Sequence, residues 1–168
     1  RTVTGVQTCA LPIWPPLQVE RAPEDLAFVQ FSSGTTVDPK PVALSHRAAL
    51  GNARAILSLV LRTAEDRHGA SWLPLYHDMG LIGCLLGAMT YPGPLVLIPP
   101  EHFLARPAIW LRALSRHRGT ISAAPSFAFS YCADRVAGAD LDGHDLSPWR
   151  IALDGAEPVS AEALRRFA

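Results

Sequence analysis

The feature that most constrains the fold is a regular alternation of short apolar segments with segments of helical periodicity. After Ser45, for example, the apolar residues Leu50, Ala53 and Leu57 recur every three or four positions, as on one face of a helix. Strands are predicted at 26–31 (a buried one), 70–73, 95–98, 120–124 and 149–153, and further helices near 80–89, from Pro107 to Gly119 and over 126–136. This alternation predicts an α/β fold, a layered and mostly parallel sheet with flanking helices.

The charge balance and the cysteine content exclude several classes of protein. The 168 residues include 15 basic and 15 acidic side chains, and this formal charge of zero gives no electrostatic case for nucleic acid or an anionic membrane as the main partner. No stretch approaches the ~20 apolar residues that a membrane-spanning helix needs. Cys9, Cys84 and Cys132 are too few and too scattered for a disulfide framework or a zinc site, so we expect a reducing, cytoplasmic location.

The two ends of the chain differ from the rest. Residues 3–13, VTGVQTCALPI, show no helical or strand period and resemble the translation of a common sequencing adaptor. We therefore expect residues 1–13 to be an artefactual leader, the alternative being an ordinary divergent N-terminus. A helical pattern begins at Ser160, a residue type that caps helices, and the chain stops at Ala168 within it. We expect residues 14–168 to be part of a larger domain.

A loop rich in hydroxyl groups follows the first predicted strand. Residues 32–40 read SSGTTVDPK, in which four hydroxyl side chains surround one glycine and a lysine closes the segment. Hydroxyl and amide donors beside a mobile positive charge suit the oxygens of a phosphate, although the Walker spacing is absent. A simple Ser/Thr-rich turn is an equal alternative on composition. The candidate phosphate-binding residues are Ser32, Ser33, Gly34, Thr35, Thr36 and Lys40.

Two further motifs lie at predicted strand ends. In WLPLYHDMGLIG (72–83), His77 beside Asp78 could form a general base with its orienting group or two metal ligands. The structural alternative is that Asp78 caps the next helix and His77 is a polar loop residue. In WRIALDGAEPV (149–159), a strand runs into Gly155 and Ala156, where an open α/β sheet binds ligands. The alternative there is that Gly155 only makes the corner.

Taken in order, these motifs resemble those of the adenylate-forming (AMP-binding) enzyme superfamily, and most closely those of fatty acyl-AMP ligases. The similarity runs from Asp25 to the end of the chain, so residues 14–168 would be part of the large N-terminal domain. The resemblance implies that the hydroxyl-rich loop and Lys40 hold ATP phosphates, and that His77 and Lys40 are catalytic. It places Asp154, Gly155, Ala156 and Glu157 beside adenine, and His77, Asp78, Met79, Pro125, Ser126 and Phe127 beside the acyl substrate.

The reaction implied by the resemblance is ATP-dependent activation of a fatty acid to an acyl-adenylate, with release of pyrophosphate and transfer to an acyl carrier protein. Mg²⁺ would assist, with its protein ligand expected beyond Ala168 and no metal ligand within this chain. The chain by itself is expected to be inactive. One alternative is a fatty acyl-CoA synthetase with CoA as acceptor. Another is a non-catalytic nucleotide- or acyl-binding paralogue, because Val37 and Pro41 stand where the family usually has glycine.

Overall fold

The computed structural model describes residues 19–31, 39–60 and 67–168. Its centre is a four-stranded sheet in which all neighbouring strands are parallel, in the order β4-β3-β5-β6. The strands are β3 (Gly69–Ser71), β4 (Leu95–Leu97), β5 (Ile121–Ala124) and β6 (Ile151–Asp154). All four fall within two residues of their predicted positions. The predicted α/β class with a mostly parallel sheet is therefore confirmed.

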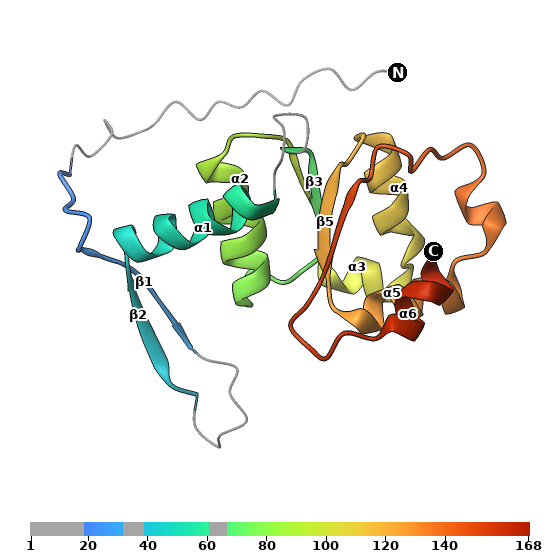
Figure 1. Cartoon of the computed structure of the whole chain (residues 1–168). Helices are drawn as coiled ribbons and strands as arrows, with labels where there is room; N and C mark the ends of the chain where they lie inside the picture. Colours follow the sequence, from blue (N-terminus) through green and yellow to red (C-terminus); the bar gives the residue numbers. More distant parts are fainter. Residues whose placement is uncertain (1–18, 32–38, 61–66) are drawn as a thin grey trace.

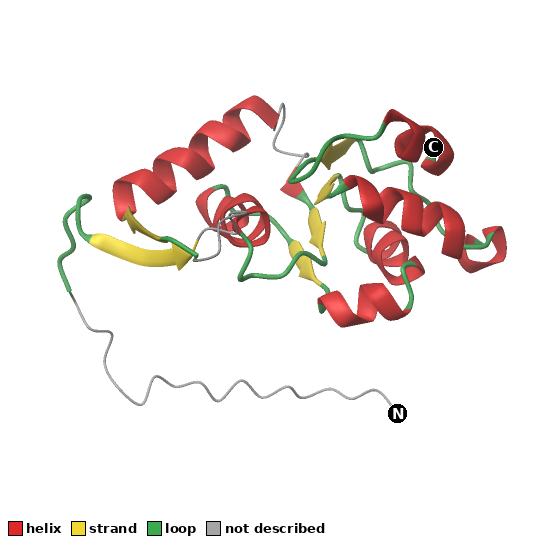
Figure 2. Cartoon of the chain, turned by 90° about the horizontal axis from the view of Figure 1, so that it is seen from below, coloured by secondary structure: helices red, strands yellow, loops and turns green. Residues whose placement is uncertain are grey.

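Helices cover both faces of this sheet, as Figures 1 and 2 show. One side carries α3 (Pro100–Ala105), α4 (Ala108–Arg116), α5 (Ser126–Arg135) and α6 (Ala161–Phe167), with the short 3₁₀-helix η3 (Gly138–Leu141). The other side carries α1 (His46–Val60), the π-helix η2 (Met79–Leu86) and α2 (Gly87–Thr90). The sheet is thus the middle layer of three, as the alternation of strands and helices requires.

The side of the sheet that faces α3–α6 is filled by aromatic rings. Trp72 stacks on Phe103 with ring centroids 3.9 Å apart, and Trp110 and Phe129 pack edge to face beside them. Trp110 is fully buried, and its Nε1–H donates to the Ser122 hydroxyl over 2.9 Å. That hydroxyl in turn donates to the Ala70 carbonyl, so these two groups are paired within the core, whereas Nε1 of Trp72 is buried without a partner.

A separate antiparallel hairpin stands away from the sheet (Figure 1). It pairs β1 (Leu26–Phe31) with β2 (Pro41–Ser45). The prediction of a strand at 26–31 is correct, but its expected burial is wrong, because Leu26 and Phe31 are 60% and 62% exposed. The partner strand β2 was not predicted, because a proline usually argues against a strand. Here the proline is the first residue of β2, a position where it is tolerated.

The helix ends follow their predicted chemistry in two places and depart from it in a third. The hydroxyls of Ser45 and Ser160 accept hydrogen bonds from the amides of Ala48 and Ala163, so both predicted caps are confirmed. Helix α4 ends at Arg116, three residues before Gly119. Helix α3 is not predicted by the sequence, because the two prolines after β4 read as a strand end, whereas the second of them opens a helix.

Candidate functional site

The junction between β3 and η2 holds the His-Asp pair in a fixed arrangement. Asp78 caps the helix, since its Oδ1 accepts the Met79 amide hydrogen over 2.7 Å. The same oxygen lies 2.8 Å from Nδ1 of His77, which is 35% exposed. The capping interpretation of Asp78 is therefore correct. Nδ1 of His77 also accepts the Met79 amide hydrogen over 3.2 Å, and these contacts leave Nε2 as the ring nitrogen available to a ligand.

A close backbone approach keeps this junction in place. A Cβ atom on Gly80 would lie 2.3 Å from the Pro74 carbonyl oxygen, so only glycine fits there. The helix that follows is wider than an α-helix, and the Gly87 amide reaches back to the carbonyl of Ile82. The predicted helix near 80–89 is therefore present, but it begins as a π-helix, a form that is rare and often found at functional sites.

The carboxyl end of β6 carries a buried carboxylate with one free acceptor. Oδ2 of Asp154 accepts a hydrogen bond of 2.6 Å from the Ser126 hydroxyl, which itself accepts the amide hydrogen of Ser160. Oδ1 of Asp154 is buried and has no partner. Immediately after it, Gly155 leaves open space where a side chain would stand, and Ala156 adopts a left-handed φ of 69°. A buried acceptor beside an open, strained turn is a place for a ligand that donates a hydrogen bond.

The start of α5 lies directly against this turn. Oε1 of Glu157 accepts the backbone N–H of Phe127 over 2.7 Å, which satisfies one of the amides that a helix leaves free at its first turn. Ser126 is buried beneath Asp154, and the Phe127 ring packs edge to face on Trp72. The predicted site residues of 125–127 and 154–157 are thus brought together, with Glu157 engaged by the helix start.

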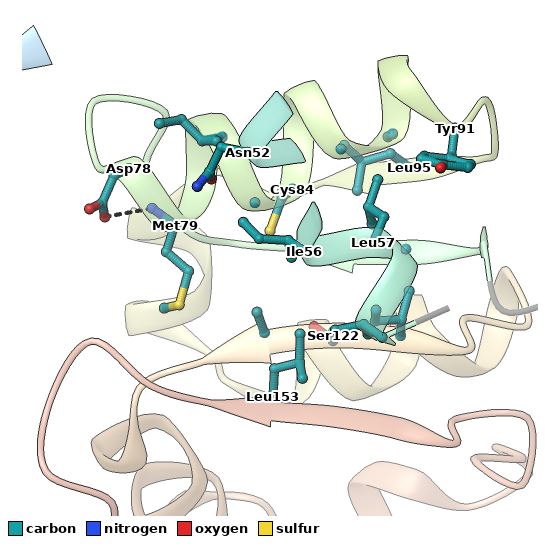
Figure 3. A pocket seen from close by; sticks show the side chains of 18 of the residues that line it. Asn52, Ile56, Leu57, Asp78, Met79, Cys84, Tyr91, Leu95, Ser122 and Leu153 are labelled. Carbon is teal, nitrogen blue, oxygen red and sulfur yellow. Dashed lines mark hydrogen bonds between the residues drawn. The ribbon is translucent and has the colours of Figure 1, made fainter. Parts of the chain in front are cut away.

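A cavity of about 730 Å³ lies between the sheet and the helices α1, η2 and α2. Figure 3 shows Ile56 and Leu57 of α1 and Cys84 of η2 facing Leu153 of β6 across it. Its walls are mainly apolar. The position of α1 over this cavity could not be predicted from the sequence, because an apolar stripe fits any packed helix equally well.

One end of this cavity joins two of the sequence motifs. The predicted site residues that line it are Asp78, Met79, Asp154, Gly155 and Ala156. His77 lies next to this end on the chain but does not line the cavity, and neither do Glu157 and the segment 125–127. Lys40 is exposed just before β2, and Ser32, Ser33, Gly34, Thr35 and Thr36 lie outside the described residues. The cavity therefore links the 72–83 and 149–159 motifs, and the predicted phosphate loop stays untested.

The two described thiols are held in the protonated form. Burial raises the pKa of Cys84, against a smaller opposing effect of a hydrogen bond from Ser71. Burial alone raises the pKa of Cys132 to about 12. Thiolate is the nucleophilic form, so neither side chain is suited to covalent catalysis at neutral pH.

Two classes of feature are absent from the part of the chain that the structure describes. No group of three His, Cys, Asp or Glu side chains in it could hold a metal ion. Within residues 19–31, 39–60 and 67–168, no helix combines the length and the apolar character that crossing a bilayer requires.

Known proteins resemble this chain in sequence over most of its length. The family model described as AMP-binding enzyme matches residues 4–168. A medium-chain-fatty-acid–[acyl-carrier-protein] ligase of Teredinibacter turnerae is 38% identical over 86% of this chain and 22% of its own length. A 4-hydroxyphenylalkanoate adenylyltransferase of Mycobacterium tuberculosis is 39% identical over 84% of this chain and 23% of its own.

The fold comparison agrees with the sequence comparison. The structure of a fatty acyl-adenylate ligase from L. pneumophila, in complex with acyl adenylate and pyrophosphate, superposes with a TM-score of 0.81 at 39% identity. That match covers 89% of this chain and 26% of the other. The chain therefore spans about a quarter of the length of the relatives it matches.

Proposed function

The chain belongs to the AMP-binding enzyme family, and on that premise we propose that the full-length protein activates a fatty acid by forming an acyl-adenylate. The carboxylate of the acid would attack the α-phosphate of ATP, and pyrophosphate would leave. The observation that carries this proposal is the apolar cavity whose one end is formed by Asp78, Met79 and Asp154. An acyl chain would occupy the cavity and place its carboxylate at that end.

The turn after β6 fits the base of a nucleotide. The buried Oδ1 of Asp154 is an acceptor without a partner, which suits the amino group of adenine. The open space beside Gly155 and the bent backbone at Ala156 would let a flat ring lie close to the main chain. The relatives described above are a ligase and an adenylyltransferase, which supports binding of a nucleotide at this turn.

The His-Asp pair would act on the acid by position and electrostatics. Nδ1 of His77 is engaged by Asp78 and the Met79 amide, so Nε2 is the ring nitrogen that would meet the acid. Lys40 would add positive charge for the phosphates, together with the hydroxyl groups of 32–36. Mg²⁺ is the ion expected to assist, and the described residues offer no set of ligands for it.

For the acceptor of the activated acyl group, we propose an acyl carrier protein. A relative named for this acceptor is 38% identical, which supports the proposal, and CoA is the alternative acceptor. The non-catalytic paralogue is the second candidate, and the substitutions Val37 and Pro41 in the phosphate loop motivate it.

The experiment is acid-dependent exchange of pyrophosphate into ATP, measured with the full-length protein and a series of fatty acids. Exchange is expected, and Lys40→Ala should weaken it by about tenfold to a hundredfold through loss of charged hydrogen bonds to phosphate. Arg54→Ala, on the exposed side of α1, serves as the matched loss of a positive charge and should change little. A complete lack of exchange with any carboxylic acid would favour the binding-only paralogue.

A further inference from the structure

The cavity ends, on the side away from Asp78 and Asp154, at an arginine. Arg67 lies just before β3 and lines the cavity together with Tyr91. Its Nε atom is buried and has no hydrogen-bond partner. A buried N–H donor without a partner is costly, so this Nε atom at the wall of a mainly apolar cavity requires a physical reason.

The main chain around this arginine is held firmly. A Cβ atom on Gly93 would lie 2.5 Å from the Arg67 carbonyl oxygen and 2.7 Å from its Cβ, so glycine alone permits this contact. The Gly69 amide donates to the Pro94 carbonyl over 2.8 Å. The guanidinium carbon of Arg67 lies 5.7 Å from the centre of the Tyr91 ring, within range of a cation–π contact. Arg67 is therefore held at this end of the cavity, its main chain by the close contact with Gly93 and its side chain by the Tyr91 ring.

The arginine is separated from the acidic groups of the cavity by the length of the sheet. Gly69 pairs with Ile121 at one end of the strands, and Asp154 pairs with Ala124 at the other. Three strand residues span about 10 Å, and Arg67 lies two residues further along. Figure 3 shows the same separation between Asp78 at one end and Tyr91 at the other. Among the described lining residues, Asp78 and Asp154 are the acidic ones, and both lie at the end of the cavity away from Arg67.

We propose that Arg67 is a specificity-determining residue, and that the acid taken by this enzyme carries a second oxygen acceptor at the far end of its chain. This inference rests on the proposed function. The best match is a terminal carboxylate, because a guanidinium binds it through two parallel charged hydrogen bonds. The substrate class is then the medium-chain α,ω-dicarboxylic acids, with ω-hydroxy acids as weaker substrates.

The same geometry predicts discrimination against ordinary fatty acids. A chain ending in methyl would fill the cavity and leave Nε of Arg67 without a partner. A site with such a buried donor rejects the analogue that lacks the matching group. Bonds between charged groups predict a preference of about tenfold to a hundredfold.

The test compares decanoic, ω-hydroxydecanoic and decanedioic acids as substrates for pyrophosphate exchange by the full-length protein. The expected kcat/KM is highest for decanedioic acid and lowest for decanoic acid, and this comparison needs no variant. Arg67→Met keeps most of the side-chain volume and should invert the order. Arg54→Met, an exposed position of α1 outside the cavity, should leave the order unchanged.

Each outcome separates the inference from the proposed function. Equal or better use of decanoic acid by the natural protein contradicts the role of Arg67, whose head group would then reach solvent. An unchanged preference in Arg67→Met contradicts it as well. Absence of exchange with every acid contradicts the proposed function itself. In that case calorimetric binding of decanedioate, tighter than that of decanoate, still supports the inference, and equal binding overturns it.

Discussion

The two sides of the four-stranded sheet are closed in different ways. Toward α3–α6, the rings of Trp72, Phe103 and Trp110 interlock and leave each other almost no exposed surface. Toward α1, η2 and α2, the helices stand off the sheet and enclose about 730 Å³ of mainly apolar space. On the filled side, buried apolar surface stabilises the fold, whereas on the hollow side apolar surface is left uncovered and is available to contact a ligand.

The buried polar groups without a partner lie on both sides of the sheet. On the filled side, the indole of Trp110 and the hydroxyl of Ser122 are hydrogen-bonded to one another, while Nε1 of Trp72 is buried without a partner. At the two ends of the hollow side, Oδ1 of Asp154 and Nε of Arg67 are buried without partners. Unpaired buried groups are rare in folded proteins, and under the proposed function the two on the hollow side mark where a ligand would begin and end. Changes on the filled side should therefore alter stability, and changes on the hollow side should alter substrate use.

The largest expected effect is on the filled side. Trp110→Ala in the full-length protein should lower the free energy of unfolding by about 3–5 kcal/mol, because it leaves a large cavity among rigid rings. Phe127→Ala, at the partly exposed edge of the same aromatic group, should cost about 1 kcal/mol. Denaturant unfolding measures both. Equal losses in the two variants would contradict the tight packing around Trp110.

The next effect belongs to the junction that supports the hollow side. Gly80→Ala would force a methyl group to within 2.3 Å of the Pro74 carbonyl, so the backbone has to move. We expect a loss of about 1–3 kcal/mol in stability, with a larger loss of exchange activity because His77 and Asp78 lie on the same junction. Gly51→Ala is the matched control, since nothing lies within 4 Å of its Cβ position. Full activity in Gly80→Ala would contradict the role of this junction in the functional site.

The smallest effect concerns the two thiols, one on each side of the sheet. Burial raises the pKa of both, so the folded protein holds these protons more tightly than the unfolded chain does. The resulting stabilisation is complete below the ordinary thiol pKa of about 9 and is lost at higher pH, for Cys132 as the pH rises toward 12. Iodoacetamide should therefore label both slowly at pH 8 in the native protein, and a bound long-chain acid should protect Cys84 but not Cys132. Peptide mapping by mass spectrometry measures the labelling of each cysteine. Equal protection of Cys84 and Cys132 by the acid would contradict binding of the acid in the cavity.

Local patterns were sufficient for the parallel sheet but not for the hairpin. Strands of apolar residues between polar turns, and caps such as Ser45 and Ser160, are visible in the sequence because their chemistry is local. The pairing of β1 with β2 depends on contacts between segments whose intervening loop carries no hairpin signature. The π-helical form of η2 depends likewise on packing around Gly80.

The candidate site was likewise predictable from the sequence only in part. The motifs around Asp78 and Asp154 are recognisable from residue order, and the structure brings them to one cavity end. Leu57, Cys84 and Arg67 carry no local signal, because an apolar stripe, a lone thiol and a loop arginine occur in any domain. Their part in the cavity follows only from the way α1 and η2 lie over the sheet.

The central claim is that the hollow side holds the chain of the acid, and one substitution tests it directly. Gly83 lines the cavity, and a Cβ there would meet only the Met79 side chain at 4.0 Å, so Gly83→Leu would fill cavity space with little disturbance. The measurement is the chain-length profile of acid-dependent pyrophosphate exchange for Gly83→Leu beside Gly51→Leu on the exposed side of α1. The account predicts about tenfold or greater loss for long acids with short acids retained in Gly83→Leu alone. Identical profiles for the natural protein and both variants would contradict it.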